Sequence, residues 1–166
     1  METLFTPWRY AYIREDRPTP DDCFFCSAAL DRDDPERLVV HWTAHHLVML
    51  NRHPYTNGHL LVAPLAHVPT PAGSDQAARA ELWPLVLSCQ EVLQEAYTPD
   101  GFNLGMNVGR AAGAGVPGHW HFHVVCRWTA DTNFMGVVAG VRLVPEELRD
   151  TWKNLRRRFG HGEGVG

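Results

Sequence analysis

Short apolar runs alternate with turn-forming residues along most of the chain, and this pattern predicts a sheet. Runs rich in aliphatic and aromatic residues and bounded by Gly, Pro, Asn or Asp are typical of buried strands. Such runs are Leu38–Val40, His46–Leu50, His59–Ala63, Phe102–Val108 and His119–Trp128. The stretch from Asn51 to Gly58, which contains Pro54, is typical of a turn.

Two longer segments have helical spacing of apolar residues. The first, Ala77 to Tyr97, follows Ser74 as a candidate N-cap and contains Pro84, which predicts a kink or a break. The second, Pro145 to Phe159, ends in three arginines. We interpret these charges as facing solvent and the helix dipole rather than as a nucleic-acid patch. Consecutive strands with one inserted and one appended helix predict an α+β fold with an antiparallel sheet.

Composition narrows the class of protein. The 166 residues are 45% hydrophobic and 20% charged, as expected for one folded domain over residues 1–166. A formal net charge of −4 disfavours nucleic-acid and membrane-surface partners, which Lys and Arg attract. No run approaches the ~18 apolar residues of a membrane span, and no secretory leader is evident, so we expect a cytoplasmic protein. The aromatic-rich segment 1–21 is expected to pack against something.

The chemistry is concentrated in a glycine-rich run that leads into three alternating histidines. On a strand, His119, His121 and His123 would share one face, with Trp120 and Phe122 behind them. Such a row either binds a metal or presents a neutral imidazole nucleophile beside two helpers. The glycines favour the nucleophile, since amides exposed in such a loop can cradle phosphate. A buried strand that carries histidines by accident would leave three imidazoles needing buried partners.

The sequence from His119 to Val125 resembles the signature of the histidine triad family at every position. Asn51 to Val62 is similar to the family's second block, and Asn107 to Gly109 to its third. These blocks span a core of about residues 22–134, with a helix at about 145–159 beyond it. The residues after the triad, Arg127 to Phe134, resemble the bacterial diadenosine tetraphosphate phosphorylases and their hydrolase relatives. The resemblance implies a five-stranded antiparallel sheet with one long packed helix and a C-terminal helix, and a homodimer.

The resemblance also implies roles for single residues. His121 would attack an α-phosphorus and become nucleotidylated, while His123 and His59 would support the phosphate oxygens. Asn51 would bond ribose hydroxyls, although it also suits a turn, and Leu47, Met49 and Leu50 are weaker candidates for a base pocket. The residues expected to orient the phosphates are Asn107, Gly113, Gly115, Val116 and Gly118.

One departure from the family concerns the residues just before the triad. Several relatives have a Ser, Thr or Gln there that contacts the phosphates or the leaving group, whereas Ala114 to Gly118 contains no side-chain donor. Backbone amides or another residue must replace it.

Four cysteines remain to be explained. Cys23 and Cys26 have the spacing of a metal half-site or a redox pair, and two thiolates so spaced can hold one edge of a tetrahedral Zn²⁺. In the metal-binding branch of the family the other ligands correspond to His67 and His119, which implies a structural zinc. The alternative is a pair of free buried thiols. Cys89 and Cys126 lie in apolar patterns and are expected in the core.

These observations favour an enzyme that cleaves dinucleoside polyphosphates, such as diadenosine tetraphosphate, at the α-phosphate through a nucleotidyl-histidine. Water or phosphate would resolve the intermediate, and the sequence does not decide which. One alternative is a nucleoside phosphoramidase of the same family. Others are a nucleotide-binding module with vestigial catalysis and a zinc protein in which all three histidines are ligands.

Overall fold

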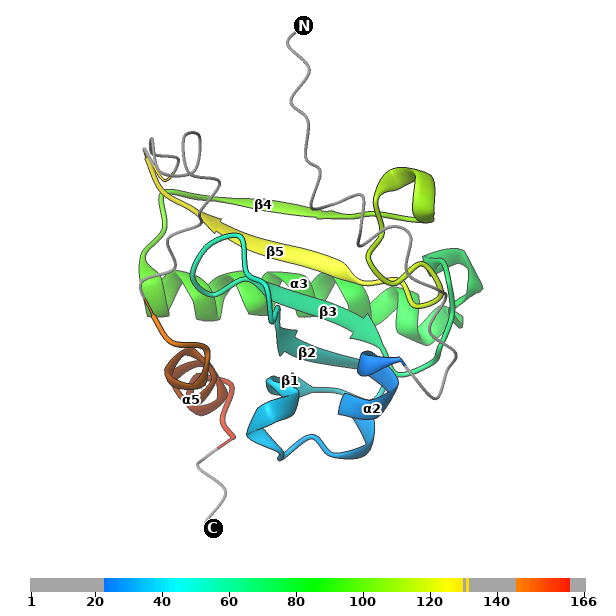
Figure 1. Ribbon diagram of the computed structural model, residues 1–166, viewed down its shortest axis with the longest axis horizontal. Helices are drawn as coiled ribbons and strands as arrows, with labels where there is room; N and C mark the ends of the chain where they lie inside the picture. Colours follow the sequence, from blue (N-terminus) through cyan, green and yellow to red (C-terminus); the bar gives the residue numbers. More distant parts are fainter. Residues whose placement is uncertain (1–22, 130, 132–145, 162–166) are drawn as a thin grey trace, which may run out of the picture.

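The computed structural model describes residues 23–129, 131 and 146–161. The predicted aromatic segment 1–21 and residues 132–145 lie outside this described part. Within the described part, the sheet has the strand order β1-β2-β3-β5-β4, and all neighbouring strands are antiparallel (Figure 1). Its strands are β1 Val39–Trp42, β2 His46–Leu50, β3 Leu60–Pro64, β4 Gly101–Met106 and β5 Phe122–Arg127. The predicted five-stranded antiparallel α+β fold is confirmed.

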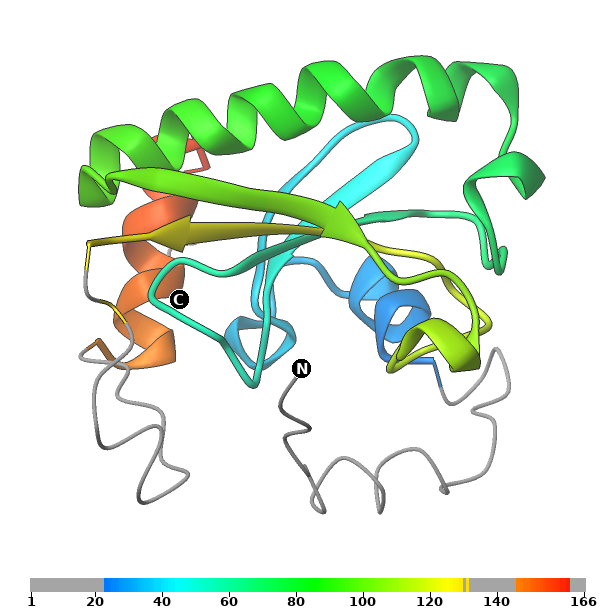
Figure 2. The ribbon, with the colours of Figure 1, turned by 90° about the horizontal axis from the view of Figure 1, so that it is seen from above.

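The two faces of the sheet are covered by different helices. The long helix α3, Gln76–Tyr97, crosses one face, and α2, Phe24–Leu30, lies on the other (Figure 2). The other helices in the described part of the chain are η2 Pro35–Arg37, η3 Pro71–Gly73, η4 Arg110–Ala112 and α5 Leu148–Arg158. Alternation divides β2 between two cores, since Val48 packs toward α3 while Leu47 packs toward α2.

Strand β5 is shorter than predicted, because its first residue is Phe122 and not His119. The amides just before it bond outside the ladder: His119 N–H donates to the Val116 carbonyl and Trp120 N–H to the Val68 carbonyl. The inward and outward alternation nevertheless continues through this segment. Trp120 and Phe122 are buried in the α3-side core, as the pattern predicts.

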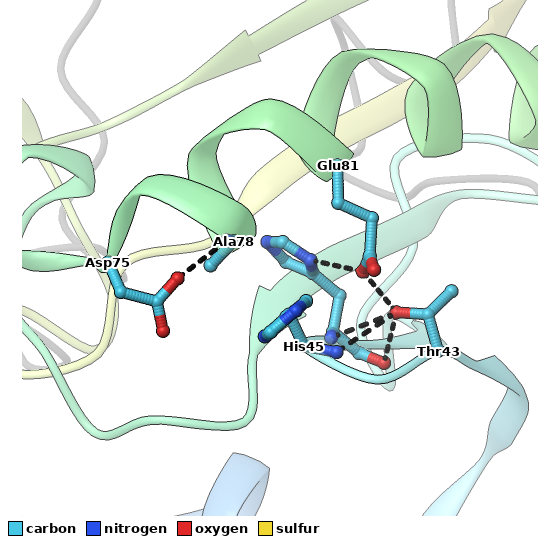
Figure 3. Close-up of polar contacts among 6 residues, drawn as sticks. Thr43, His45, Asp75, Ala78 and Glu81 are labelled. Carbon is cyan, nitrogen blue, oxygen red and sulfur yellow. Dashed lines mark hydrogen bonds and ion pairs between the residues drawn. The ribbon is translucent and has the colours of Figure 1, made fainter.

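The N-cap of helix α3 lies one residue later than predicted. Asp75, not Ser74, is the N-cap, and its carboxylate accepts the Ala78 N–H at 2.7 Å (Figure 3). Ser74 is buried instead and accepts the indole N–H of Trp120 at 2.9 Å. The helix continues through Pro84 without a break.

Side-chain contacts tie the helices α3 and α5 to the sheet. Thr43 and the buried His46 lie at the turn between β1 and β2. Glu81 of α3 accepts from the Thr43 hydroxyl, and its Oε1 lies 2.9 Å from His46 Nδ1 (Figure 3). On α5, Arg156 is buried, contrary to the prediction of a solvent-facing charge. Its guanidinium donates to the Val39 carbonyl and to Asp33, so this arginine holds α5 on β1. No helix among the described residues has the length and apolar character of a membrane span.

Candidate active site and metal centre

Two cysteines and two histidines from three segments form a compact cluster. Cys23 and Cys26 lie at the start of α2, His67 follows β3, and His119 precedes β5. Their ligand atoms all lie within 4.8 Å of one another. His119 Nδ1 is 3.4 Å from Cys23 Sγ and 3.6 Å from Cys26 Sγ, and His67 Nδ1 is 3.3 Å from Cys26 Sγ. A tetrahedron with Zn–S of about 2.3 Å and Zn–N of about 2.0 Å has S–N edges of about 3.5 Å, so the donor set fits zinc.

His119 is held in the tautomer that a metal ligand needs. Its Nε2 lies 2.8 Å from the Pro64 carbonyl, which can only accept, so Nε2 carries the proton and Nδ1 presents its lone pair to the sulfurs. Without a metal, burial and the neighbouring Cys23 raise the pKa of Cys26 to about 11. A bound cation would lower this pKa by favouring the thiolate.

Gly118 contributes space to the cluster. A Cβ atom at this position would lie 3.2 Å from Nε2 of His67, which is tight even for van der Waals contact. Gly118, which is predicted to bind phosphate, therefore has a second reason to be a glycine.

The histidines continue as a row across the sheet on the face opposite α3. The rings of His121 and His123 have centroids 5.0 Å apart, and His59 lies 5.2 Å beyond His123. Phe25 of α2 is 5.0 Å from both His119 and His121 and bridges the row to the metal cluster. His59, His119 and His121 are buried, while His123 is partly exposed. The row predicted from alternation is therefore present.

Hydrogen bonds fix the tautomers of His59 and His123. His59 Nδ1 accepts from the Tyr55 N–H at 3.2 Å and faces the amide of Asn51 at 3.3 Å. Its proton therefore sits on Nε2, which donates to His123 Nδ1 at 2.9 Å. In a neutral His123 the remaining proton is then on Nε2. This atom is available to donate to a ligand.

His121 is held in the opposite sense. Its Nδ1 lies 3.1 Å from the carbonyl oxygen of His119, so Nδ1 carries the proton and Nε2 keeps a lone pair. Burial lowers the pKa of His121, and burial together with His121 lowers the pKa of His123 to about 4. Both imidazoles are therefore neutral near pH 7, and His121 has the form of a nucleophile.

The glycine loop between β4 and β5 is folded back on itself at its start. Gly113 adopts a positive φ of 83° and its amide donates to the Arg110 carbonyl at 2.9 Å. The amides of Gly115, Val116 and Gly118 donate to no other residue in the described part of the chain. These three, and not the amide of Gly113, are available for phosphate. Met106 pairs with Phe122, so continuing the register places Asn107 opposite His121.

The residues expected near the nucleoside are Asn51 and three apolar residues of β2. The side chain of Asn51 is already engaged, because Oδ1 accepts the His53 N–H at 2.9 Å and Nδ2 faces His59. Leu47 and Met49 are covered by the α2-side core, and Leu50 packs on the α3 face. These three residues therefore do not line an open base pocket together.

Sequence reasoning missed Phe25 and Tyr55. Phe25 contacts two of the triad histidines, and the ring of Tyr55 lies 4.6 Å from His59 and 6.1 Å from His123. Phe25 lies between the two cysteines, and Tyr55 lies four residues before His59, but proximity in sequence does not show where a ring points.

Comparison with known proteins shows the family of the chain. The model of the HIT domain matches residues 33–130, which is more than half of the chain. The chain belongs to the HIT family. Among HIT relatives, the AP-4-A phosphorylase of Mycobacterium tuberculosis is 34% identical, over 93% of this chain and 83% of its own length.

Two further HIT proteins extend the comparison. The asymmetrical bis(5′-nucleosyl)-tetraphosphatase of Schizosaccharomyces pombe is 30% identical over 56% of this chain and 50% of its own length. The crystal structure of a Zn-bound histidine triad family protein from Mycobacterium smegmatis has a TM-score of 0.68 and 24% identity, and the match covers 86% of this chain and 96% of that chain. At this identity the structural match supports the fold.

Proposed function

We propose that the protein transfers a nucleotidyl group from dinucleoside polyphosphates, such as diadenosine tetraphosphate, to phosphate or water. The observation that carries this proposal is the hydrogen bond between the His121 ring and the His119 carbonyl. The Nδ1–H of His121 donates to the His119 carbonyl, and Nε2 keeps the lone pair of a neutral nucleophile beside His123. Membership in a family with a named phosphorylase and a named tetraphosphatase supports an enzyme.

The first step forms a bond between His121 Nε2 and the α-phosphorus. The bond from this phosphorus to the bridging oxygen breaks, and its electron pair leaves with the nucleoside polyphosphate. The ring becomes positively charged while its Nδ1–H still donates to the His119 carbonyl. Attack by phosphate or water then breaks the N–P bond, and imidazole leaves as a neutral base.

His123 suits the oxygens of the reacting phosphate. The hydrogen bond from His59 to His123 Nδ1 leaves the proton of a neutral His123 on Nε2. This N–H can donate to the bridging oxygen as negative charge develops there. A phosphate leaving group, with a second pKa of about 6, needs no proton near pH 7. An amine leaving group must be protonated, and a neutral His123 is a poor acid. This supports polyphosphate substrates over nucleoside phosphoramidates.

The remaining predicted residues would bind rather than react. The amides of Gly115, Val116 and Gly118 are proposed to hold non-bridging oxygens, which replaces the side-chain donor missing from Ala114 to Gly118. Asn107 would assist from opposite His121, and Asn51 would act mainly by orienting His59.

Zinc is proposed at Cys23, Cys26, His67 and His119, where it would be structural. It would hold α2 against the segment that carries the triad. No reaction step uses the metal, because its four ligands close the site.

Phosphate and water are the two candidate acceptors of the nucleotidyl group, and we propose phosphate. The 34% identity to an AP-4-A phosphorylase over most of both chains supports it. Hydrolysis is the second candidate, supported by the tetraphosphatase relative.

Incubation with diadenosine tetraphosphate tests both parts of the proposal. With phosphate we expect ATP and ADP, whereas a hydrolase yields ATP and AMP whether or not phosphate is present. An alkaline quench followed by peptide mapping should locate a nucleotidyl group on His121. We expect His121→Asn to lower kcat by several orders of magnitude while it retains nucleotide binding. A label on His123, or near-normal turnover by His121→Asn, would contradict the mechanism.

A further inference from the structure

The four cysteines differ in how far solvent reaches them. Cys26 is partly exposed, whereas Cys23, Cys89 and Cys126 have no exposed surface. His67 is the other partly exposed member of the metal cluster, and its Nδ1 lies 3.3 Å from Cys26 Sγ. The cluster is therefore open on the side of Cys26, and a small oxidant that enters there meets this sulfur before that of any other cysteine.

A second sulfur lies next to the exposed one. Cys23 is the N-cap of α2, and Cys26 lies in the first turn, where the Ser27 N–H donates to the Cys23 carbonyl. Residues three apart on a helix are neighbours on one face. The two sulfurs lie within 4.8 Å of each other. An exposed thiolate beside a second cysteine is typical of a redox-sensitive pair, in which the second sulfur resolves the oxidised first one.

This pair is connected to the proposed nucleophile in two ways. Phe25, between the two cysteines, is buried, and its ring lies 5.0 Å from the rings of both His119 and His121. His119 faces the two sulfurs with Nδ1, and its carbonyl accepts the Nδ1–H of His121. A change at Cys23 and Cys26 therefore reaches the position and the tautomer of His121.

We propose that Cys26 is an oxidation site for peroxide, and that a Cys23–Cys26 disulfide releases the metal and slows nucleotidyl transfer. The Cys26 thiolate attacks one peroxide oxygen, and the O–O bond breaks to give a sulfenic acid and hydroxide. The Cys23 thiolate then attacks the Cys26 sulfur, the S–O bond breaks, and a second hydroxide leaves as the disulfide forms. The two sulfurs lose two electrons, and solvent protons convert the two hydroxides to water.

Disulfide formation removes half of the ligand set. Zinc is held by thiolates and not by disulfide sulfurs, so only His67 and His119 would remain as ligands. The effect on transfer rests on the function proposed above, whereas the oxidation and the release of zinc do not.

The test treats the zinc-loaded protein with hydrogen peroxide and follows zinc release with a colorimetric chelator. We expect release together with a Cys23–Cys26 disulfide in non-reducing peptide maps, while Cys89 and Cys126 remain open to alkylation after denaturation. Dithiothreitol with zinc should reverse both changes. Cys89→Ala, which removes a buried thiol of α3, should release zinc as wild type does. Zinc retained under peroxide, or released without this disulfide, overturns the proposal.

The rate of nucleotidyl transfer to His121 is measured on the same samples. Peroxide should lower this rate by roughly 10- to 100-fold, since a displacement of about 1 Å can cost 100-fold. Dithiothreitol with zinc should restore it. In Cys26→Ser, which lacks the exposed thiolate, peroxide should leave the rate at its untreated value.

The outcomes separate this inference from the proposed function. An equal fall under peroxide in Cys26→Ser and wild type, or unchanged transfer once the disulfide has formed, overturns the link from the cluster to His121. Untreated protein that transfers no nucleotide to His121 contradicts the proposed function instead, and zinc release and the disulfide still decide whether Cys26 is the oxidation site.

Discussion

At the scale of single residues, the site depends on which nitrogen of each histidine carries the proton. His121 and His123 are near neighbours with opposite tautomers, because a carbonyl accepts from Nδ1 of the first while an imidazole donates to Nδ1 of the second. One presents a lone pair and the other an N–H, which are the two groups that nucleophilic attack on a phosphate requires. Their roles follow from these partners and not from the residue type.

Because the fold lowers the pKa of His123, we expect the free energy of unfolding to depend on pH. In the folded protein this pKa is about 4, against about 6.5 in an unfolded chain. Between these values the unfolded chain holds a proton that the folded chain lacks, so the free energy of unfolding falls as the pH decreases through this window. The stability is fully present above about pH 6.5.

Urea unfolding at several pH values checks this prediction. His123→Gln should flatten the pH dependence of the free energy of unfolding between about pH 4 and 6.5. His53→Gln, at an exposed position, is the control for removing a histidine. An unchanged slope in His123→Gln would mean that this residue is not kept neutral by the fold.

At the scale of elements, the pattern of apolar runs located every described strand to within a few residues. It is clearest for β2 and β3, where burial on both faces gives continuous apolar runs. It failed where the backbone leaves the ladder, because the His119 amide donates within its own turn to Val116 and the Trp120 amide donates to Val68 of a distant segment. It also chose Ser74 over Asp75 as the cap, because either side chain suits that role and only tertiary structure brings Trp120 to Ser74. The histidine row followed from alternation, and the spacing of Cys23 and Cys26 indicated half of a metal site, but His67 and His119 were assigned to it only by family resemblance.

Helix α2 is the element whose attachment to the sheet we expect zinc to stabilise. Its first residues supply Cys23 and Cys26, so zinc would join this short helix to the segments around His67 and His119. We expect about one zinc per chain in the purified protein, and its loss from Cys26→Ser. Loss of the metal should lower Tm, by about 2–4 °C for each kcal/mol of lost stability in a chain of this length.

Metal analysis and thermal unfolding measure both effects. Cys89→Ala, which alters a buried thiol of α3 away from the cluster, should retain zinc and separates metal loss from simple core damage. Cobalt substitution should give the absorption of tetrahedral thiolate coordination in wild type but not in Cys26→Ser. Folded and active wild-type protein without any metal would refute the site.

At the scale of the whole molecule, the two outer strands of the sheet differ. The edge of β1 is covered by α5, whose Trp152 and Arg156 donate to the Val39 carbonyl. Strand β4 is the other outer strand, and no described strand pairs with its open side. An uncovered edge is suited to strand addition.

The residues next to this edge support a homodimer, which we propose as the assembly. Trp83 and Leu87 lie one turn apart on α3 and are 53% and 42% exposed. Leu104 of β4 is 36% exposed, and alternation with Phe102 and Met106 puts it on the α3 face as well. Apolar side chains next to an open strand edge form a surface that a second copy can cover symmetrically.

Sedimentation of the purified protein tests this assembly. We expect a mass of twice 18.7 kDa at micromolar concentration. Leu87→Glu should shift the protein toward the monomer, because an unpaired carboxylate in a closed apolar interface remains desolvated. Leu30→Glu is the matched control, since Leu30 is 91% exposed on α2, on the opposite face of the sheet, and its change should leave the dimer intact. A monomeric wild type, or dissociation by Leu30→Glu but not by Leu87→Glu, would show that copies do not meet along β4 and α3.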